Sequence, residues 1–265
     1  MDQPLFLSSG KKIQLKDFDS GYTSEFKKKT GKHETHQILK ELDHLAYQLY
    51  AESRRSVLVV LQGMDASGKD GTIRMLARGI SPQCLDVVSF KEPSSLELSH
   101  DFLWRVHKAM PAYGRIGIFN RSHYEDVLVV RIRKLVEEDV WQARYEQINA
   151  FEKLLTDGGL TILKCFLHIS KDEQRQRFEA RLQDPQKQWK LVPEDVKDRE
   201  RWDAFQDAYN DALTRCNTTN APWYIVPSDR KWYRDLVIAR LLRDTLKKMN
   251  PRYPEFDPSS IPQMK

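Results

Sequence analysis

A phosphate-binding loop is predicted at residues 63–69, where Gly-Met-Asp-Ala-Ser-Gly-Lys has the spacing G-x-x-x-x-G-K. Small residues in such a loop let consecutive backbone N–H groups converge on a phosphate chain, and the lysine adds a positive charge. The loop follows a buried-strand pattern and precedes a helical stretch, as this chemistry requires. A strand–turn–helix corner without a ligand is the alternative. The predicted phosphate-binding residues here are Gly63, Ala66, Ser67, Gly68, Lys69, Asp70 and Gly71.

Two aspartates set this loop apart from the usual pattern. Asp70 stands where a Ser or Thr hydroxyl normally binds magnesium, so the ion must find another ligand. Asp65, inside the loop, offers a carboxylate that faces the phosphates, and capping of a turn amide is its alternative role. Asp70 lies in the first helical turn, where the helix dipole favours a negative charge.

A second polar cluster follows the third predicted strand and consists of Asn120, Arg121, Glu125 and Asp126. Ligands bind at the carboxyl ends of parallel strands, where an acidic group completes the magnesium site of phosphate-loop enzymes. Arg121 can place a bidentate fork on a phosphoryl group during its transfer. The alternative is a helix N-terminus capped by Asn120 or Ser122, with acids that interact with the dipole.

Basic side chains recur along the predicted helix 171–182 and just after it. Arg177 and Arg181 are four residues apart on one face, and Lys187 and Lys190 follow. Together these cations could clamp a polyanionic phosphate donor while the segment closes and excludes water. The alternative is an exposed helix face on which they pair with neighbouring glutamates.

Aromatic and histidine side chains near these clusters have two interpretations. Phe102 and Trp104 could stack on a nucleobase, although aromatics at helical spacing belong more often to a core. His123 and His168 are predicted to be structural or hydrogen-bonding residues, because no Ser/His/Asp arrangement suited to nucleophilic catalysis accompanies them.

The elements that must position these residues alternate along the chain. Short β-branched apolar runs predict strands buried on both faces at 57–61, 87–90, 116–119, 160–169 and 223–226. Helices are predicted at 33–54, 69–80, 95–109, 123–158 with a break, 171–182, 196–215 and 231–249. This order predicts a three-layer α/β/α fold around a central parallel five-stranded sheet. Residues 183–200 are predicted to form a mobile excursion above the carboxyl edge of the sheet.

Composition narrows the class of protein. The chain has 265 residues, 43 basic and 38 acidic side chains and 40% hydrophobic positions, which suits a single domain over 1–265. Its formal charge of +5 is too small to indicate a nucleic-acid binder, and no apolar run approaches the roughly 20 residues of a membrane span. Three cysteines without paired spacing argue against a disulfide framework or a zinc site, and a cytoplasmic location is expected. Within the domain we expect an N-terminal arm at 1–32, a lid at about 171–201 and a tail at 251–265.

Five motifs together resemble the second family of polyphosphate kinases. They begin with Gly-Met-Asp-Ala-Ser-Gly-Lys-Asp-Gly at 63, Phe-Asn-Arg-Ser-His-Tyr-Glu-Asp at 119, Phe-Leu-His-Ile-Ser-Lys-Asp-Glu-Gln at 166, Trp-Lys at 189 and Ala-Pro-Trp-Tyr at 221. The resemblance extends from about residue 11 to 254 and implies a thymidylate-kinase-like phosphate-loop fold with a helical lid, assembled as a homodimer or homotetramer. It also implies reversible transfer of a phosphoryl group from inorganic polyphosphate to adenine nucleotides, and possible use of guanine nucleotides, with Mg²⁺ or Mn²⁺.

The same resemblance implies roles for individual residues. Glu125 resembles the subgroup that phosphorylates both AMP and ADP. Asn120 replaces an aspartate found in other members of the family, which leaves open whether Asp126 or water takes its place as a ligand. The family's metal-binding carboxylates match Asp65 and Asp126, and its catalytic positions match Asp65, Lys69, Arg121 and Asp126. The predicted nucleotide contacts are Asn120, Arg121, Glu125, Phe102 and Trp104.

Two other functions use the same residue types. One is an ATP-dependent nucleoside-monophosphate kinase, although such kinases normally have Ser or Thr at the position of Asp70. The other is a sensor that binds polyphosphate or a nucleotide without turnover. A sensor has no need of the full set Asp65, Lys69, Arg121 and Asp126.

Overall fold

A six-stranded sheet forms the centre of the chain in the computed structural model, which describes residues 5–6 and 10–256. The strand order is β1-β6-β5-β2-β4-β3. All five predicted strands are present and parallel, which confirms the predicted α/β class. The short β1 adds an antiparallel edge that the sequence did not predict, because two residues produce no recognisable pattern. The strands are β1 (Leu5–Phe6), β2 (Ser56–Gln62), β3 (Leu85–Ser89), β4 (Ile116–Asn120), β5 (Leu160–His168) and β6 (Trp223–Pro227).

The register of the sheet brings the predicted chemical residues to one edge. β2 is buried at every position and lies between β4 and β5, as its unbroken apolar run predicts. Parallel pairing aligns Leu61 with Asn120 and Asn120 with Ser89. The phosphate loop after β2 and the polar segment after β4 therefore begin at neighbouring positions on the carboxyl edge.

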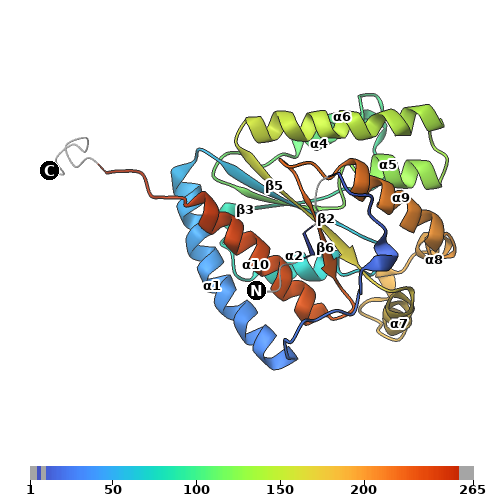
Figure 1. Cartoon of the computed structure of the whole chain (residues 1–265), viewed down its shortest axis with the longest axis horizontal. Helices are drawn as coiled ribbons and strands as arrows, with labels where there is room; N and C mark the ends of the chain where they lie inside the picture. The colour runs from blue at the N-terminus through green and yellow to red at the C-terminus, as the bar shows by residue number, and fades with distance from the viewer. Residues whose placement is uncertain (1–4, 7–9, 257–265) are drawn as a thin grey trace.

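Helices cover both faces of this sheet, as Figure 1 shows. One layer packs α1, α2 and α10 against a core that includes Leu42, Val59 and Leu236. The other layer packs α4, α5, α6 and α9 against cores that include Tyr124, Phe166 and Val106. The bounds of these helices are α1 (Lys28–Glu52), α2 (Lys69–Ala77), α4 (Trp104–Lys108), α5 (Glu125–Ile132), α6 (Glu138–Asp157), α9 (Trp202–Arg215) and α10 (Lys231–Met249).

The predicted helix 95–109 is instead two short helices, α3 (Ser95–Leu98) and α4. A capping box between Ser94 and Glu97 starts α3. The Asp101 side chain then accepts a hydrogen bond from the Leu103 backbone N–H at 3.0 Å. This local turn competes with continued helix, which is why periodicity alone gave the wrong prediction.

The segment between β5 and β6 contains more helix than predicted. It holds α7 (Lys171–Leu182), a 3₁₀ turn η3 (Gln188–Lys190) and α8 (Pro193–Glu200). The excursion predicted for 183–200 is helical over 193–200, because Pro193 is at the first helical position, where its missing N–H costs nothing. The helix predicted at 196–215 is instead divided at Arg201 into α8 and α9. Figure 1 places α7 and α8 beyond the end of the sheet to which β5 points.

The described part of the arm packs against the body, whereas the tail leads away from it. Within the arm, the backbone N–H groups of Ile13 and Leu15 donate to Thr214 Oγ1 (2.9 Å) and Asn210 Oδ1 (2.8 Å) on α9. The helix α1 begins at Lys28, inside the range assigned to the arm. The tail leaves the end of α10, and its last residues, 257–265, lie outside the described part, as do residues 1–4 and 7–9 of the arm.

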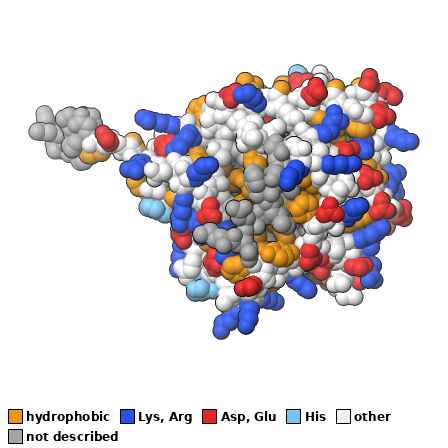
Figure 2. Space-filling view, in the orientation of Figure 1, with side chains coloured by type: hydrophobic (Ala, Val, Ile, Leu, Met, Phe, Trp, Pro, Cys, Tyr) orange, Lys and Arg blue, Asp and Glu red, His pale blue; other side chains and the backbone are white. Residues whose placement is uncertain are grey.

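Two features of the described residues concern membranes and surface charge. None of the described helices combines the length and the apolar character that crossing a membrane requires. Basic and acidic side chains are interspersed over the face shown in Figure 2.

Candidate active site

The loop between β2 and α2 curls through left-handed backbone conformations. Gly63 and Gly68 have φ angles of 144° and 111°, and Ala66 has a φ of 61°. A Cβ atom on Gly63 would lie 2.7 Å from the Leu167 carbonyl oxygen. Gly63 is therefore required both by its φ angle and by the close approach of β5.

An arginine of α10 explains the other glycines of the loop. Arg234 is 2% exposed, and its Nη1 lies 3.3 Å from the Ser67 carbonyl oxygen. A Cβ atom would lie 1.7 Å from Arg234 Nη1 if added to Gly68, and 3.1 Å from Nη2 if added to Gly71. Sequence reasoning missed Arg234, because nothing near residue 234 signals contact with a loop more than 160 residues earlier.

Arg177 of α7 bonds to the same loop. Its Nη1 donates to the carbonyl oxygens of Ala66 (2.8 Å) and Ser67 (3.0 Å), and its Nη2 to those of Ser228 (2.6 Å) and Asp229 (3.2 Å). Its Nε donates to Glu173 Oε1 at 2.8 Å, so all three guanidinium nitrogens bond to the protein. These contacts favour support of the loop over the predicted contact with phosphate, which stays a prediction.

Lys69 is buried at the start of α2 and folds back over the loop. Its Nζ donates to the carbonyl oxygens of Gly63 at 2.7 Å and Met64 at 3.2 Å. Burial lowers the pKa of Lys69, while the nearby Asp65 carboxylate opposes that shift. The ammonium group thus lies inside the curl of the loop, where a phosphate group would be recognised.

Asp65, Arg121 and Glu125 form a chain of charges in front of the loop. Arg121 Nη2 lies 2.7 Å from Asp65 Oδ1, and its Nη1 lies 3.6 Å from Glu125 Oε2. Burial alone would raise the pKa of Asp65, but the charges of Arg121 and Lys69 outweigh it and hold that pKa below its ordinary value. The negative charge of Glu125, and to a smaller extent that of Asp65, raises the pKa of Arg121. Arg121 itself has a φ of 63°, a conformation that non-glycine residues rarely adopt.

Asp126 points toward a different set of arginines. Its Oδ1 lies 3.3 Å from Arg144 Nη1, and its Oδ2 lies 3.7 Å from Arg105 Nη2. Burial raises the pKa of Asp126 although both arginines oppose the shift. Asp126 Oδ2 accepts no hydrogen bond from the described residues. Arg121 therefore pairs with Asp65 and Glu125, not with Asp126. Within the described residues, no ion pair links Asp65 and Asp126 to the same cation.

The segment after α7 reaches the phosphate loop through Asp70. Asn120 Nδ2 donates to Asp70 Oδ1 at 3.0 Å, and Lys190 Nζ lies 2.6 Å from Asp70 Oδ2. Lys187 pairs with Asp184 on the surface. Asp70 therefore connects β4, the loop and the predicted lid, which is more than the interaction with the helix dipole expected from the sequence.

The predicted lid also contains a carboxylate that sequence reasoning missed. Asp195 of α8 is 9% exposed, and its Oδ2 accepts a hydrogen bond from the Val192 N–H at 3.3 Å. Burial, together with the negative charge of Asp65, raises the pKa of Asp195 to about 6, while Arg181 and Arg121 oppose the shift. Asp195 and Arg181 thus lie within electrostatic range of Asp65.

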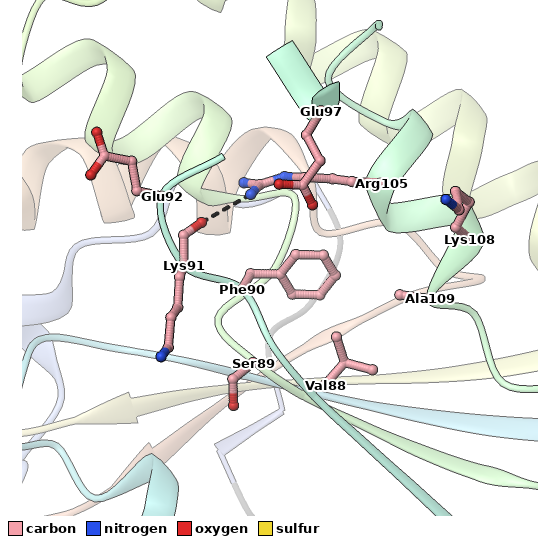
Figure 3. Close-up of a pocket in the computed structure, with 9 residues that line it drawn as sticks. All are labelled: Val88, Ser89, Phe90, Lys91, Glu92, Glu97, Arg105, Lys108 and Ala109. Atoms are coloured by element: carbon pink, nitrogen blue, oxygen red, sulfur yellow. Dashed lines mark hydrogen bonds between the residues drawn. The ribbon is translucent and has the colours of Figure 1, made fainter. Parts of the chain in front are cut away.

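A cavity of about 350 Å³ opens at the carboxyl end of β3 (Figure 3). Arg105 forms part of its wall, donates to the Lys91 carbonyl oxygen at 2.9 Å and points toward Glu97. The Phe90 N–H bonds to the Asn120 carbonyl oxygen, which ties the cavity to the end of β4. Its lining consists of Val88, Ser89, Phe90, Lys91, Glu92, Glu97, Arg105, Lys108 and Ala109.

The two predicted base-stacking residues lie elsewhere. Arg144 covers the Phe102 ring at 4.7 Å, and Trp104 stacks on His100 with ring centroids 4.0 Å apart. Lys108 Nζ lies 4.1 Å from the centroid of the Trp104 ring. Because other side chains contact both rings and neither residue lines the cavity, the structure does not favour their predicted role as a base clamp.

A divalent cation suits the donors on the loop side of the site. The described residues contain no group of three or more His, Cys, Asp or Glu side chains placed to hold a metal ion. Mg²⁺ usually binds through one or two carboxylates, substrate phosphates and water, so it does not need such a cage. Asp65, ionised and 2.7 Å from Arg121, meets that requirement.

Comparison with known proteins decides the family. Residues 25–254 match the model of a family described as polyphosphate kinase 2. The chain belongs to this family. The AMP/ADP-polyphosphate phosphotransferase of Meiothermus ruber is 48% identical over 253 residues, which cover 94% of each chain. The ADP-polyphosphate phosphotransferase of Rhodopseudomonas palustris is 40% identical over 266 residues, covering 96% of this chain and 92% of the relative.

A solved structure of the family has the same fold. The crystal structure of polyphosphate kinase 2 from Arthrobacter aurescens superposes with a TM-score of 0.93 at 38% identity. The match covers 98% of this chain and 95% of the other chain. The resemblance inferred from five short motifs is therefore confirmed over nearly the whole chain.

Proposed function

We propose that this polyphosphate kinase 2 family member transfers the terminal phosphoryl group of inorganic polyphosphate to AMP and ADP, reversibly and with a divalent cation. One observation carries the proposal. The chain Asp65–Arg121–Glu125 crosses directly in front of a phosphate loop that holds Lys69. Phosphoryl transfer needs positioned charges more than covalent catalysis, and this arrangement supplies them. The names of the two relatives support the same substrates.

Basic residues beyond the loop suit a polyanionic donor. Lys190 already contacts the loop through Asp70, and Lys187 and Arg181 lie on the same segment. Lys231 at the start of α10 belongs to the same group of cations. Partial burial lowers its pKa, and so do the positive charges of Arg177, Arg234 and Lys187. We therefore place the donor chain over Arg181, Lys187, Lys190 and Lys231, with its reacting end at the loop.

The acceptor fits on the opposite side, toward β3. The cavity there offers Arg105 and Lys108 as cations, next to Asn120. Glu125 stands between this side and Arg121. A carboxylate at that position can tell an acceptor with one phosphate from an acceptor with two, because repulsion grows with the acceptor's charge.

Each charged side chain has a definite task in this proposal. Lys69 and the loop N–H groups bind the phosphoryl group, and Arg121 stabilises the charge that develops on its oxygens. Asp65 and Glu125 pair with opposite ends of the Arg121 guanidinium, orient it and provide oxygen ligands. Mg²⁺ or Mn²⁺ would neutralise phosphate charge at those ligands. Asp126 stays a predicted ligand, although its arginine partners favour a role in shaping the acceptor side.

Phosphorus NMR of the purified protein with magnesium, polyphosphate and AMP, without ATP, tests the proposal. ADP and then ATP signals should grow while the polyphosphate shortens. Turnover only after ATP replaces polyphosphate would identify a nucleoside-monophosphate kinase, and binding without turnover in either mixture would identify a sensor. Repeating the assay with GMP and GDP checks the prediction for guanine nucleotides, and light scattering checks the predicted homodimer or homotetramer.

A further inference from the structure

A fully buried ionic network lies beneath the segment that carries Arg121 and Glu125. Lys164 of β5 and Glu152 of α6 are both 0% exposed, and their Nζ and Oε2 atoms are 2.6 Å apart. Lys164 Nζ also donates to Tyr124 Oη at 2.8 Å and to the Cys216 carbonyl oxygen at 2.7 Å. An ammonium group has three N–H donors, so all three of its donors have acceptors.

The network continues into the turn before α5. Glu152 Oε1 accepts a hydrogen bond from Tyr124 Oη at 2.9 Å and lies 3.2 Å from His123 Nε2. Because Oε1 is a carboxylate oxygen, His123 must carry a proton on Nε2 to bond with it. Two consecutive residues of the turn are thus held by one buried carboxylate.

The same turn is tied to the strand that leads into the phosphate loop. Ser122 Oγ accepts hydrogen bonds from Gln62 Nε2 at 3.0 Å and from the Tyr124 N–H at 3.2 Å. The Arg121 N–H bonds to the Leu61 carbonyl oxygen at 3.1 Å. Residues 121–124 are therefore fixed from both sides, with Arg121 held in its left-handed conformation.

A contribution to folding stability does not by itself explain this buried network. A buried ion pair is often no more stabilising than apolar side chains of the same volume, because both charges lose their hydration. A residue with a φ of 63° persists only where its surroundings fix it, and such strain is found at functional sites. The network holds His123 and Tyr124, the second and third residues after that position, and makes no contact with the charged groups of Asp65, Arg121 and Glu125.

We propose that Lys164, Glu152 and Tyr124 are positioning residues for phosphoryl transfer, which hold Arg121 and Glu125 in place against the phosphate loop. The inference rests on the proposed function, since it assigns these residues to that reaction. They touch no substrate; they act through the turn 121–124. Misplacement of a catalytic group by about 1 Å can reduce a rate by roughly a hundredfold, so small losses in this network should be measurable as turnover.

The test compares Tyr124→Phe with a control substitution in the other core. Tyr124→Phe deletes one hydroxyl that bonds to both Lys164 and Glu152, and leaves the ion pair intact. We expect kcat to fall about tenfold, with the KM for polyphosphate changed less than twofold. Leu42→Ala, which removes a fully buried side chain from α1 in the other core, should leave kcat within twofold. The double variant Lys164→Met/Glu152→Gln keeps the site electrically neutral and should lose more turnover than Tyr124→Phe.

Repeating Tyr124→Phe in a protein that already carries Arg121→Lys distinguishes a positioning role from a general loss of structure. If the network acts through Arg121, Tyr124→Phe should reduce kcat less than twofold when Arg121→Lys is already present. The same tenfold factor in both backgrounds, or an equal fall for Leu42→Ala, would overturn the proposal.

Hydrogen exchange gives a readout that does not depend on turnover. Amides of 121–126 should exchange at least fivefold faster in Tyr124→Phe, with no change there in Leu42→Ala. Unchanged exchange would overturn the inference even if the wild type is active. Absence of polyphosphate-dependent transfer in the wild type would instead refute the proposed function, and the exchange result would still decide whether the network holds this turn.

Discussion

Arg177 and Arg181 lie on the same helix four residues apart, yet the structure predicts opposite consequences for their removal. Arg177 donates five hydrogen bonds of 2.6–3.2 Å, two of them to carbonyl oxygens of the phosphate loop and two to carbonyl oxygens just after β6. Hydrogen bonds to a charged group contribute about 1.5–3 kcal/mol each, and breaking a buried charge pair costs about 3–5 kcal/mol. Because these contributions are not additive, we expect Arg177→Met to lower the unfolding free energy by about 3–5 kcal/mol.

Arg181 makes a much weaker set of contacts within the described structure. It lies over the Phe178 ring at 5.8 Å and is partly exposed near Asp65. Arg181→Met should therefore change the unfolding free energy by less than about 1 kcal/mol. If Arg181 contacts the donor, its loss should raise the KM for polyphosphate about tenfold and flatten the dependence of KM on salt concentration.

Two measurements on the matched pair decide between support and donor binding. Urea unfolding gives the stability of each variant, and initial rates at several salt concentrations give the KM for polyphosphate. For Arg177→Met we expect lower stability, lower kcat and a KM for polyphosphate within twofold of the wild type. A stable Arg177→Met protein with a strongly raised KM would show that this arginine binds the donor and that our interpretation of its contacts is wrong.

Four further changes test the rest of the site. Lys69→Met should reduce kcat at least a hundredfold without unfolding the chain, as turnover and circular dichroism would show. Gly68→Ala should impair both folding and turnover, because its Cβ would lie 1.7 Å from Arg234 Nη1; a normal melting temperature would contradict this. Glu125→Asn should reduce the use of AMP more than that of ADP, and equal losses would count against its role in selecting the acceptor. Asp195→Asn tests the pKa of about 6, because the folded protein favours the protonated carboxyl. Between pH 4 and pH 8 the wild type should lose up to about 3 kcal/mol more stability than the variant, measured by unfolding both proteins at both pH values.

The fold was largely predictable because its signals are local. The unbroken apolar run of β2 indicates a strand buried on both faces, and the structure places it at the centre of the sheet. The predicted range 171–182 coincides with α7. The errors occur where one side chain redirects the backbone, as Asp101 does between α3 and α4, or where a proline starts a helix, as Pro193 does in α8.

The candidate site was predictable only in part. Spacing identified the loop, Asp65 and Arg121, because their positions follow from strand ends that meet at one edge. Spacing could not show that Asp126 points toward Arg105 and Arg144, since these partners come from two other helices. Long side chains of one type can point in different directions, and their contacts depend on the packing of distant elements.

The same contacts limit which part of the lid can move. Arg177 and Gln174 of α7 bond to the backbone carbonyl oxygens of Asp65, Ala66 and Ser67. Movement of α7 would therefore break the support of the loop that the reaction requires. Beyond Leu182, the segment meets the loop through the ion pair between Lys190 and Asp70, which is partly exposed and can exchange its partner for a phosphate. Opening for a donor chain should therefore occur after Leu182, while α7 stays with the body.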